Sequence, residues 1–298
     1  MTRRFTWLAW TAATCTYLLI VLGAVVRITG SGLGCGEHWP LCNGRVLPPL
    51  DLPTLIEYAH RLVAVLVSVL VAWLAAYAWW LRRGPGQATT PPPATGAVYL
   101  GTAAAATRPS RLAYGALALL MVQVALGAVT VKLRLPPWTV ILHLGTAMLL
   151  LATLLVAAAG QPIAVPTPAG AALLLLCLVT VLFGGLTANL GAASACLGFP
   201  LCNGQVAPAG NVLQHIHWTH RLLAYALVAS TAWWAVHTRP RGAWLLVALL
   251  GLQLGVGGVM VLLALPRPLE AAHVAAGTAV WAVLVQAVIR STLSARAK

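Results

Sequence analysis

The chain has 298 residues, of which 60% are hydrophobic and only 7% charged. Long apolar runs at this density exclude a soluble globular protein and leave no segment for a soluble domain, so we expect an all-α polytopic membrane protein. Its 18 Lys and Arg against 4 Asp and Glu give a net charge of +14. Because basic residues in the loops of a membrane protein serve topology, we expect no nucleic-acid partner.

Eight apolar segments of about twenty residues follow one another, each long enough to cross roughly 30 Å of hydrocarbon. We expect transmembrane helices near residues 5–27, 58–81, 112–132, 139–159, 169–188, 217–237, 243–264 and 271–291. The first segment lacks a small-residue cleavage site at a suitable distance, so we interpret it as a retained helix and not a signal peptide. Segment 84–109 is rich in Pro, Ala and Thr and is expected to be a flexible linker.

Basic residues are distributed unevenly between the two sets of loops. Eleven Lys and Arg lie on the side of the N-terminus and five on the opposite side. The positive-inside rule therefore predicts a multi-pass protein of the cell membrane, with both termini and the linker in the cytoplasm. The loops that contain cysteine pairs then face outward.

The chain also contains an internal repeat. The motif LCNG at 41–44 recurs at 201–204, and His60, Arg61 and Leu62 recur as His220, Arg221 and Leu222, both at an offset of 160. At an offset of 130 the residues that recur are Gln123, Gly127, Val131, Pro136 and His143, which return as Gln253, Gly257, Val261, Pro266 and His273. We therefore predict two tandem pseudo-symmetric four-helix bundles, residues 1–160 and 161–298, related by an axis along the membrane normal.

Four histidines lie near the start of the second, fourth, sixth and eighth predicted helices, at His60, His143, His220 and His273. An intramembrane histidine requires a partner, and for any one of them a hydrogen-bonded packing role is an alternative. Repeated positions favour two facing pairs, His60 with His143 and His220 with His273. Two axial imidazoles without clustered carboxylates or thiolates suit a haem iron better than zinc.

Arginines and cysteines surround these histidines. Arg61 and Arg221 directly follow a histidine, so either contact with haem propionates or snorkelling to the headgroups is open. Cys35 and Cys42 lie in the first outer loop, and Cys196 and Cys202 in its repeat, one residue out of register. Two loop disulfides are expected, and their role as structural staples or as redox groups is open.

Glu57 stands three residues before His60, whereas the repeat has His217 three residues before His220. A carboxylate on the same helix face as an iron ligand can take or relay protons. The alternative is a helix-start acid favoured by the helix dipole. This asymmetry predicts that the chemistry is located in the first half.

The residues quoted above resemble the haem A synthase family. The resemblance runs from GAVVRITGSGLGCGEHWPLCNG through EYAHR and LHLGTA to FGGLTANLGAASACLGFPLCNG, HRLLAY and AAHVAAGTA, and covers nearly the whole chain except the linker. It implies a membrane haem-dependent oxidoreductase that oxidises a methyl group of haem O to the formyl group of haem A, for terminal oxidase biogenesis. The methyl carbon passes through alcohol and hydrated aldehyde stages.

The resemblance also assigns roles to residues. It implies that haem O, the substrate, is handled by Glu57, His60 and His143, beside a loop redox pair of Cys35 and Cys42. A haem b cofactor is implied between His220 and His273. Beyond the lipid bilayer and haem O, the implied partners are a haem O synthase, an electron donor and oxidase assembly factors.

Two other classes of function are compatible with parts of the pattern. A dihaem membrane cytochrome that only transfers electrons explains the four histidines, but gives no role to the difference between Glu57 and His217. A quinone-linked membrane thiol oxidoreductase explains the cysteine loops, but leaves the histidines without a role. Only a synthase changes the haem itself.

Overall fold

A computed structural model describes residues 2–37, 39–83, 99–160, 166–239 and 242–296. These residues form eight α-helices, a short 3-10 helix η1 (Ala192–Ala195) and no β-strand, only two isolated bridges in loops. The α-helices are α1 (Arg3–Ile28), α2 (Leu52–Arg83), α3 (Tyr99–Lys132), α4 (Pro137–Ala159), α5 (Pro168–Asn189), α6 (Val212–Thr238), α7 (Ala243–Leu262) and α8 (Arg267–Arg296). The expected all-helical fold is confirmed.

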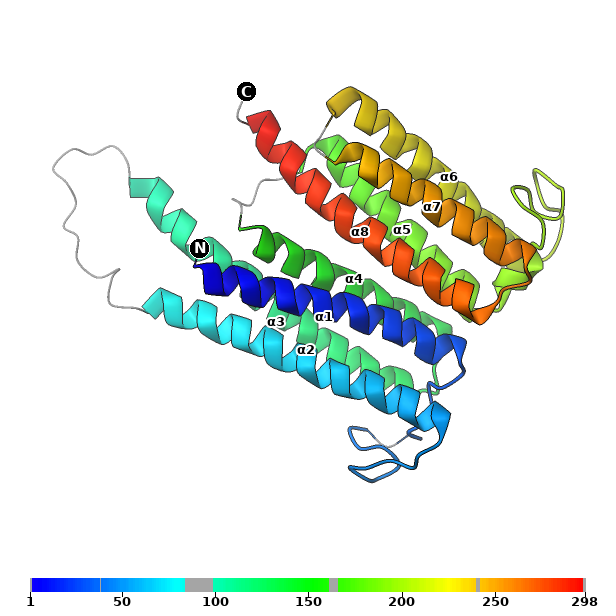
Figure 1. The fold of residues 1–298 in the computed structure, drawn as a ribbon, viewed down its shortest axis with the longest axis horizontal. Coiled ribbons are helices and arrows are strands. Elements are labelled where there is room, and N and C mark those ends of the chain that lie inside the picture. Colours follow the sequence, from blue (N-terminus) through cyan, green and yellow to red (C-terminus); the bar gives the residue numbers. More distant parts are fainter. Residues whose placement is uncertain (1, 38, 84–98, 161–165, 240–241, 297–298) are drawn as a thin grey trace.

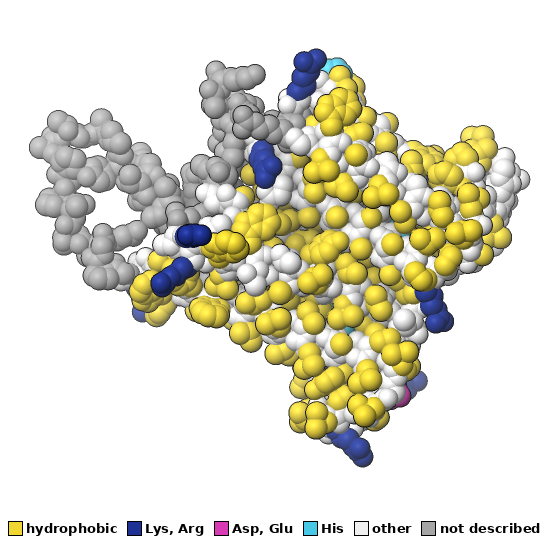
Figure 2. All heavy atoms as spheres, viewed as in Figure 1, with side chains coloured by type: hydrophobic (Ala, Val, Ile, Leu, Met, Phe, Trp, Pro, Cys, Tyr) yellow, Lys and Arg dark blue, Asp and Glu magenta, His cyan; other side chains and the backbone are white. Residues whose placement is uncertain are grey.

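Seven of these helices, all except α6, are long and apolar enough to span a membrane. Helix α6 has 27 residues, but His215, His217, His220 and Arg221 all fall within its first ten. These polar residues lower its mean hydropathy, so composition alone does not mark it as a span. Figure 2 shows hydrophobic side chains covering one face of the molecule, with Lys and Arg near its ends.

The predicted boundaries differ from the structure mainly at α3. This helix begins at Tyr99, whereas the sequence predicted a start near residue 112. Residues 101–106, GTAAAA, include four consecutive alanines, which are strong helix formers. The C-terminal part of the predicted linker, residues 99–109, is therefore helical, and residues 84–98 lie outside the described part of the chain.

Short polar side chains begin several helices by accepting hydrogen bonds from the first turn. Thr2, Thr167 and Asn211 cap α1, α5 and α6 in this way. Before α2, Asp51 Oδ1 accepts from the N–H of Thr54 at 3.1 Å. Hydrogen bonds from the side chain and backbone of Thr54 hold the pKa of the Asp51 carboxyl below its usual value.

The helices run roughly parallel to one another, and both chain ends lie at one end of the molecule (Figure 1). The loops α1–α2 and α5–α6, which contain the cysteine pairs, project from the opposite end, called here the disulfide end. Helix α1 packs against α2, α4 and α8, and α4 also packs against α3, α5 and α8. Helix α6 packs against α5 and α7, and α7 against α8.

Polar contacts join α8 to α1 and α4. Arg27 Nη2 donates to Glu270 Oε2 at 3.0 Å near the disulfide end, and the Tyr17 hydroxyl donates to the Ala275 carbonyl at 3.0 Å. The buried Trp281 indole donates to the Met148 carbonyl at 2.9 Å. Because α8 carries His273 and α4 carries His143, these contacts fix the helices of two predicted sites relative to each other.

Local backbone conformations recur between the two disulfide loops and between the α3–α4 and α7–α8 turns. Asn43 and Asn203 have positive φ angles of 51° and 52°, and each loop has a bridge next to its second cysteine, Cys42 with Arg45 and Cys202 with Gln205. The two turns also contain consecutive positive-φ residues, Arg134 and Leu135 in one and Ala264 and Leu265 in the other. The repeat seen in the sequence therefore extends to local structure.

Candidate functional site

Each of the four predicted histidines packs its ring against a glycine on the preceding helix. A Cβ atom added to Gly23, Gly127, Gly184 or Gly257 would lie 3.2, 3.2, 2.9 or 3.0 Å from Cε1 of His60, His143, His220 or His273, respectively. At the shorter of these distances a methyl group would displace the ring. The glycines therefore allow each imidazole to lie directly against a helix backbone.

The four histidines can be described as two pairs, His60 with His143 and His220 with His273. His143 is close enough to His60 to interact with it electrostatically, and His220 interacts in the same way with His273. All four rings lie on helix turns near the disulfide end. The described residues contain no group of three or more His, Cys, Asp and Glu side chains that could hold a metal ion together.

Glutamines contact two of the histidines. Gln123 Nε2 lies 3.1 Å from His143 Nε2, and Gln253 Nε2 lies 3.3 Å from His273 Nε2. The buried atoms without a hydrogen-bond partner in the described chain include Oε1 of both glutamines and Nδ1 of His60, His143 and His273. Buried polar atoms are normally paired, so these orphaned atoms, gathered around two histidine pairs, fit a polar group bound there.

His60 and His220 differ in how their other ring nitrogen is held. His220 Nδ1 lies 3.1 Å from the Thr180 carbonyl oxygen, to which it donates a hydrogen bond. A carbonyl acceptor on Nδ1 fixes the tautomer, leaves Nε2 free as a metal ligand and makes it more basic. His60 Nδ1 is buried without such a partner. The second pair therefore has one ligand that is firmly oriented, and the first pair does not.

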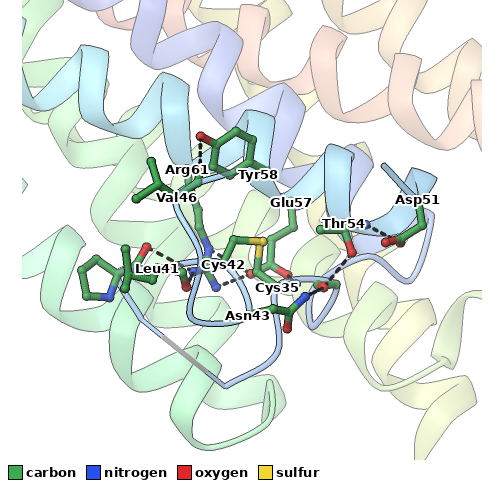
Figure 3. Close-up of a disulfide and its surroundings, with 12 residues drawn as sticks. Cys35, Leu41, Cys42, Asn43, Val46, Asp51, Thr54, Glu57, Tyr58 and Arg61 are labelled. Carbon is green, nitrogen blue, oxygen red and sulfur yellow. Dashed lines mark hydrogen bonds and ion pairs between the residues drawn. A yellow bond between two sulfur atoms is a disulfide. The ribbon is translucent and has the colours of Figure 1, made fainter. Parts of the chain in front are cut away.

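Glu57 lies at the centre of a hydrogen-bond cluster beneath the first disulfide loop (Figure 3). Glu57 is 3% exposed, and its Oε1 accepts from Arg61 Nε at 3.1 Å and from Arg61 Nη2 at 2.6 Å. Its other oxygen, Oε2, accepts from the backbone N–H of Cys35 at 2.8 Å. The carboxylate thus joins the helix of His60 to the disulfide.

Arg61 also binds the loop directly. Its Nη1 donates to the carbonyl of Leu41 at 2.8 Å and, more weakly, to that of Pro40 at 3.4 Å (Figure 3). Tyr58 supports the same loop by donating to the Val46 carbonyl at 2.9 Å. The guanidinium therefore points toward the disulfide loop, and in this structure it holds the loop over the helix start.

In the second half His217 occupies the place of Glu57. Its Nδ1 lies 3.1 Å from the Ala192 carbonyl oxygen, and Arg221 Nε donates to its Nε2 at 3.2 Å. Arg221 also donates from Nη1 and Nη2 to the carbonyls of Cys196, Gly198 and Leu201, at 2.6, 2.6 and 2.9 Å. The arginine clamp on the loop is thus common to both halves, whereas the carboxylate is not.

Both predicted disulfides are present. Cys35 is bonded to Cys42 and Cys196 to Cys202, with sequence separations of 7 and 6. All four cysteines are buried. Cys196 has no carboxylate on its backbone N–H among the described residues, and its sulfur lies 3.7 Å from the Gln214 carbonyl oxygen. The two disulfides are therefore alike as loop staples but differ in what they contact.

The chemistry of these residues fits an iron-containing group: the buried, unpartnered ring nitrogens of His60, His143 and His273 are of the type that would hold a haem iron. Two apolar cavities, of about 400 and 440 Å³, lie toward the end opposite the disulfides and contain none of these histidines. These cavities are therefore not part of either histidine site.

Sequence reasoning missed several residues of this arrangement. It noted Gln123 and Gln253 only as repeat markers, and it gave no role to Gly23, Gly184 or Thr180. The glutamines could have been found, because they keep a constant distance in sequence to a histidine in both copies. The Thr180 contact uses a backbone carbonyl, for which no side-chain signal exists.

The fold and the loops define a class of protein: an all-helical protein with seven candidate membrane spans and two loops that are each closed by a disulfide. A family model for cytochrome oxidase assembly proteins, COX15-CtaA, matches residues 6–54 and 52–285. The chain therefore belongs to the COX15-CtaA family.

Individual relatives agree with this assignment. Heme A synthase of Symbiobacterium thermophilum is 31% identical over 300 residues, covering 92% of this chain and 91% of the relative. Heme A synthase of Alkalihalophilus pseudofirmus is 30% identical over 226 residues, covering 71% and 69%. A protoheme IX farnesyltransferase of Thermus thermophilus is 30% identical over 308 residues, covering 93% of this chain but 46% of that protein.

Proposed function

We propose that this protein is a haem A synthase, a membrane oxidoreductase that oxidises a methyl group of haem O to the formyl group of haem A for terminal oxidases. One observation carries the proposal: the chain is similar over 92% of its length to a Heme A synthase and has two histidine pairs, one of them beside a buried carboxylate. Electron-transfer chemistry alone gives that carboxylate no role.

The proposed architecture has two four-helix halves, residues 1–160 and 161–298, related by an axis along the membrane normal. The first half binds haem O between His60 and His143, and the second binds a haem b cofactor between His220 and His273. The recurring loop conformations and the glycine behind each histidine support this division. Bound haem supplies one-electron redox chemistry at each histidine pair.

The two pairs are proposed to differ in ligand exchange. His220 is oriented by the Thr180 carbonyl and would hold a haem permanently. His60 has no acceptor for Nδ1 among the described residues, so it suits a ligand that can be replaced while substrate is oxidised. Glu57 stands three residues before His60 on α2, and its carboxylate is proposed to take or relay a proton beside the haem O site.

Arg61 and Arg221 support these sites from the loop side. Both hold the disulfide loops by donating to backbone carbonyls, Leu41 in one and Leu201 in the other. Contact between the guanidinium groups and haem propionates stays a prediction. The same holds for a redox role of Cys35 and Cys42, which the Glu57 contact with Cys35 would connect to the substrate site.

The proposed orientation places both termini in the cytoplasm and the disulfide loops outside, because basic residues are more numerous on the terminal side. Proposed partners are the lipid bilayer, an electron donor, oxidase assembly factors and a haem O-producing farnesyltransferase. The farnesyltransferase is supported by the Thermus thermophilus relative. That protein, a protoheme IX farnesyltransferase, contains a region of slightly less than half its length that is similar to nearly this whole chain.

The test is haem extraction and mass analysis from cells that make haem O, with and without the protein. We expect haem A only when the protein is present, and haem O but no haem A with Glu57→Ala. Glu37→Ala is the matched control, because this acid lies in the disulfide loop that Glu57 contacts but is half-exposed and paired with Arg134. Absence of haem A with the wild-type protein would falsify the function, and normal haem A with Glu57→Ala would remove Glu57 from the chemistry.

A further inference from the structure

The two halves differ in the net charge beside their first histidine. In the first half the Glu57 carboxylate is ion-paired with Arg61 at 2.6 Å, so their charges cancel. In the second half the four hydrogen-bond acceptors of Arg221 are one imidazole nitrogen and three backbone carbonyls. All four acceptors are neutral if the imidazole is neutral.

The contacts of His217 settle its protonation. Nε2 accepts from Arg221 Nε–H, so it carries no hydrogen, and Nδ1 donates to the Ala192 carbonyl, so it carries one. A second proton on the ring would direct an N–H at the N–H of the arginine. His217 therefore binds Arg221 without neutralising it, unlike a carboxylate at the same place.

The resulting positive charge is enclosed by protein. Arg221 is 5% exposed, and a buried charge is screened less by solvent and salt than a surface charge. Glu270, the acid nearest in sequence to His273, is ion-paired with Arg27 at 3.0 Å and so brings no net charge. Arg221 directly follows His220, one of the two ligands proposed for haem b.

We infer that Arg221 is a fixed positive charge that raises the reduction potential of the haem held by His220 and His273, and that His217 leaves this charge uncancelled. The inference rests on the proposed function, in which this half binds haem b. Ferric haem iron gains one electron and loses one positive charge on reduction, so a nearby cation favours the reduced form. Because the charges of Glu57 and Arg61 cancel, this pair does not raise the reduction potential of a haem in the first half. An electron is therefore held preferentially by the haem of the second half.

The experiment is a spectroelectrochemical titration of the purified holoprotein, carried out on three forms. His217→Glu reproduces the first-half pattern and is expected to lower the midpoint potential. His217→Gln is the matched control: it can still accept from Arg221 but adds no charge, and its midpoint is expected to stay near that of wild type. Equal midpoints for His217→Glu and wild type overturn the inference.

A second pair of variants separates the charge of Arg221 from its hydrogen bonds to the loop carbonyls. Arg221→Lys and Arg221→Met both remove the forked hydrogen bonds, but only the lysine keeps the charge. We expect the midpoint of the methionine variant to fall below that of the lysine variant. Equal values mean that Arg221 acts only by holding the loop, and overturn the inference.

Failure of the proposed function gives a different result. If the wild-type holoprotein has no low-spin haem, or if His220→Ala retains it unchanged, the assignment of haem b to this half fails and the inference fails with it. A haem that depends on His220 but whose potential does not respond to the charge at positions 217 and 221 overturns the inference alone.

Discussion

The helix starts of α2 and α6 are two versions of one structure. Each has an arginine that binds the carbonyls of a disulfide loop and a histidine whose ring lies against a glycine. They differ at one partner of the arginine, Glu57 in α2 and His217 in α6. The arginine contacts with the loop are thus the same in both halves, and the difference is that the arginine partner is an acid in the first half and an imidazole in the second.

A second difference concerns the orienting contact behind the histidine. His220 donates to the Thr180 carbonyl, whereas His60 Nδ1 has no partner among the described residues. Orientation of the unligated ring nitrogen distinguishes tightly held metal ligands from loosely held ones. The comparison therefore predicts a permanent cofactor in the second half and a site open to exchange in the first.

The largest expected effect is the loss of haem b on removal of a ligand from the second half. His220→Ala should abolish the low-spin haem b spectrum of the purified protein, whereas His60→Ala should retain it, because each residue belongs to a different pair. Reduced-minus-oxidised absorption spectra measure this. His215→Ala, an exposed residue on the same helix as His220, is the control. Equal loss of haem b in both variants would show that the two pairs are not separate sites.

The sequence predicted those features that depend on the residue types within a single helix. All eight α-helices of the described residues were expected from the sequence, although α6 is too polar at its start to be marked as a membrane span by hydropathy alone. The sequence did not predict the partners of Arg61, since carbonyls of Pro40 and Leu41 are brought to it by an irregular loop. Contacts made by backbone atoms in loops leave no pattern in residue type.

The same reasoning explains the missed glycines. Gly23 and Gly184 lie in apolar helices among many small residues. Whether a histidine ring covers them depends on how each helix is rotated about its axis relative to its neighbour, here called the helix phase. Helix phase depends on tertiary packing, which a single sequence does not contain. Start residue Tyr99 of α3 was missed for another reason: Pro and Thr in 84–109 obscured a helix-forming alanine run.

Substitution of Gly184 or Gly23 should affect one histidine pair without affecting the other. Gly184→Ala places a methyl 2.9 Å from Cε1 of His220, so the ring must shift. Overpacking costs about 1–3 kcal/mol, or roughly 5- to 150-fold in affinity. We therefore expect haem b content to fall, as measured by titration of the apoprotein with haem.

Gly23→Ala is the first-half counterpart, with a methyl 3.2 Å from Cε1 of His60, and should lower haem A output while haem b remains. Gly251→Ala is the control, because no atom lies within 4 Å of its added Cβ, and alanine is otherwise favoured over glycine in a helix by about 1 kcal/mol. If Gly184→Ala binds haem b as well as Gly251→Ala does, the rings are not positioned by these glycines.

The disulfides should show equal stability effects and unequal functional effects. Replacing either pair by serine opens a loop of similar length, 7 or 6 residues in separation, and is expected to cost about 2–3 kcal/mol. Only the Cys35→Ser and Cys42→Ser double variant should also lower haem A output, because loss of this disulfide frees the loop whose backbone N–H at position 35 binds Glu57. Thermal unfolding in detergent measures the first effect, and haem extraction the second. Similar haem A output from the two double variants would contradict the special position of the first loop.

The smallest expected effect concerns the ion pair between α1 and α8. Arg27 and Glu270 are 29% and 24% exposed, so their pairing should contribute no more than about 1 kcal/mol to the free energy of unfolding. The Arg61 and Glu57 side chains are 14% and 4% exposed, and removal of one partner there leaves a buried charge. A double-mutant cycle with Arg27→Gln and Glu270→Gln, at low and high salt, measures the coupling. A weak coupling that falls with salt means that apolar packing and the Trp281 contact hold the helices together, whereas a coupling of several kcal/mol would make this ion pair as important to the fold as the buried one.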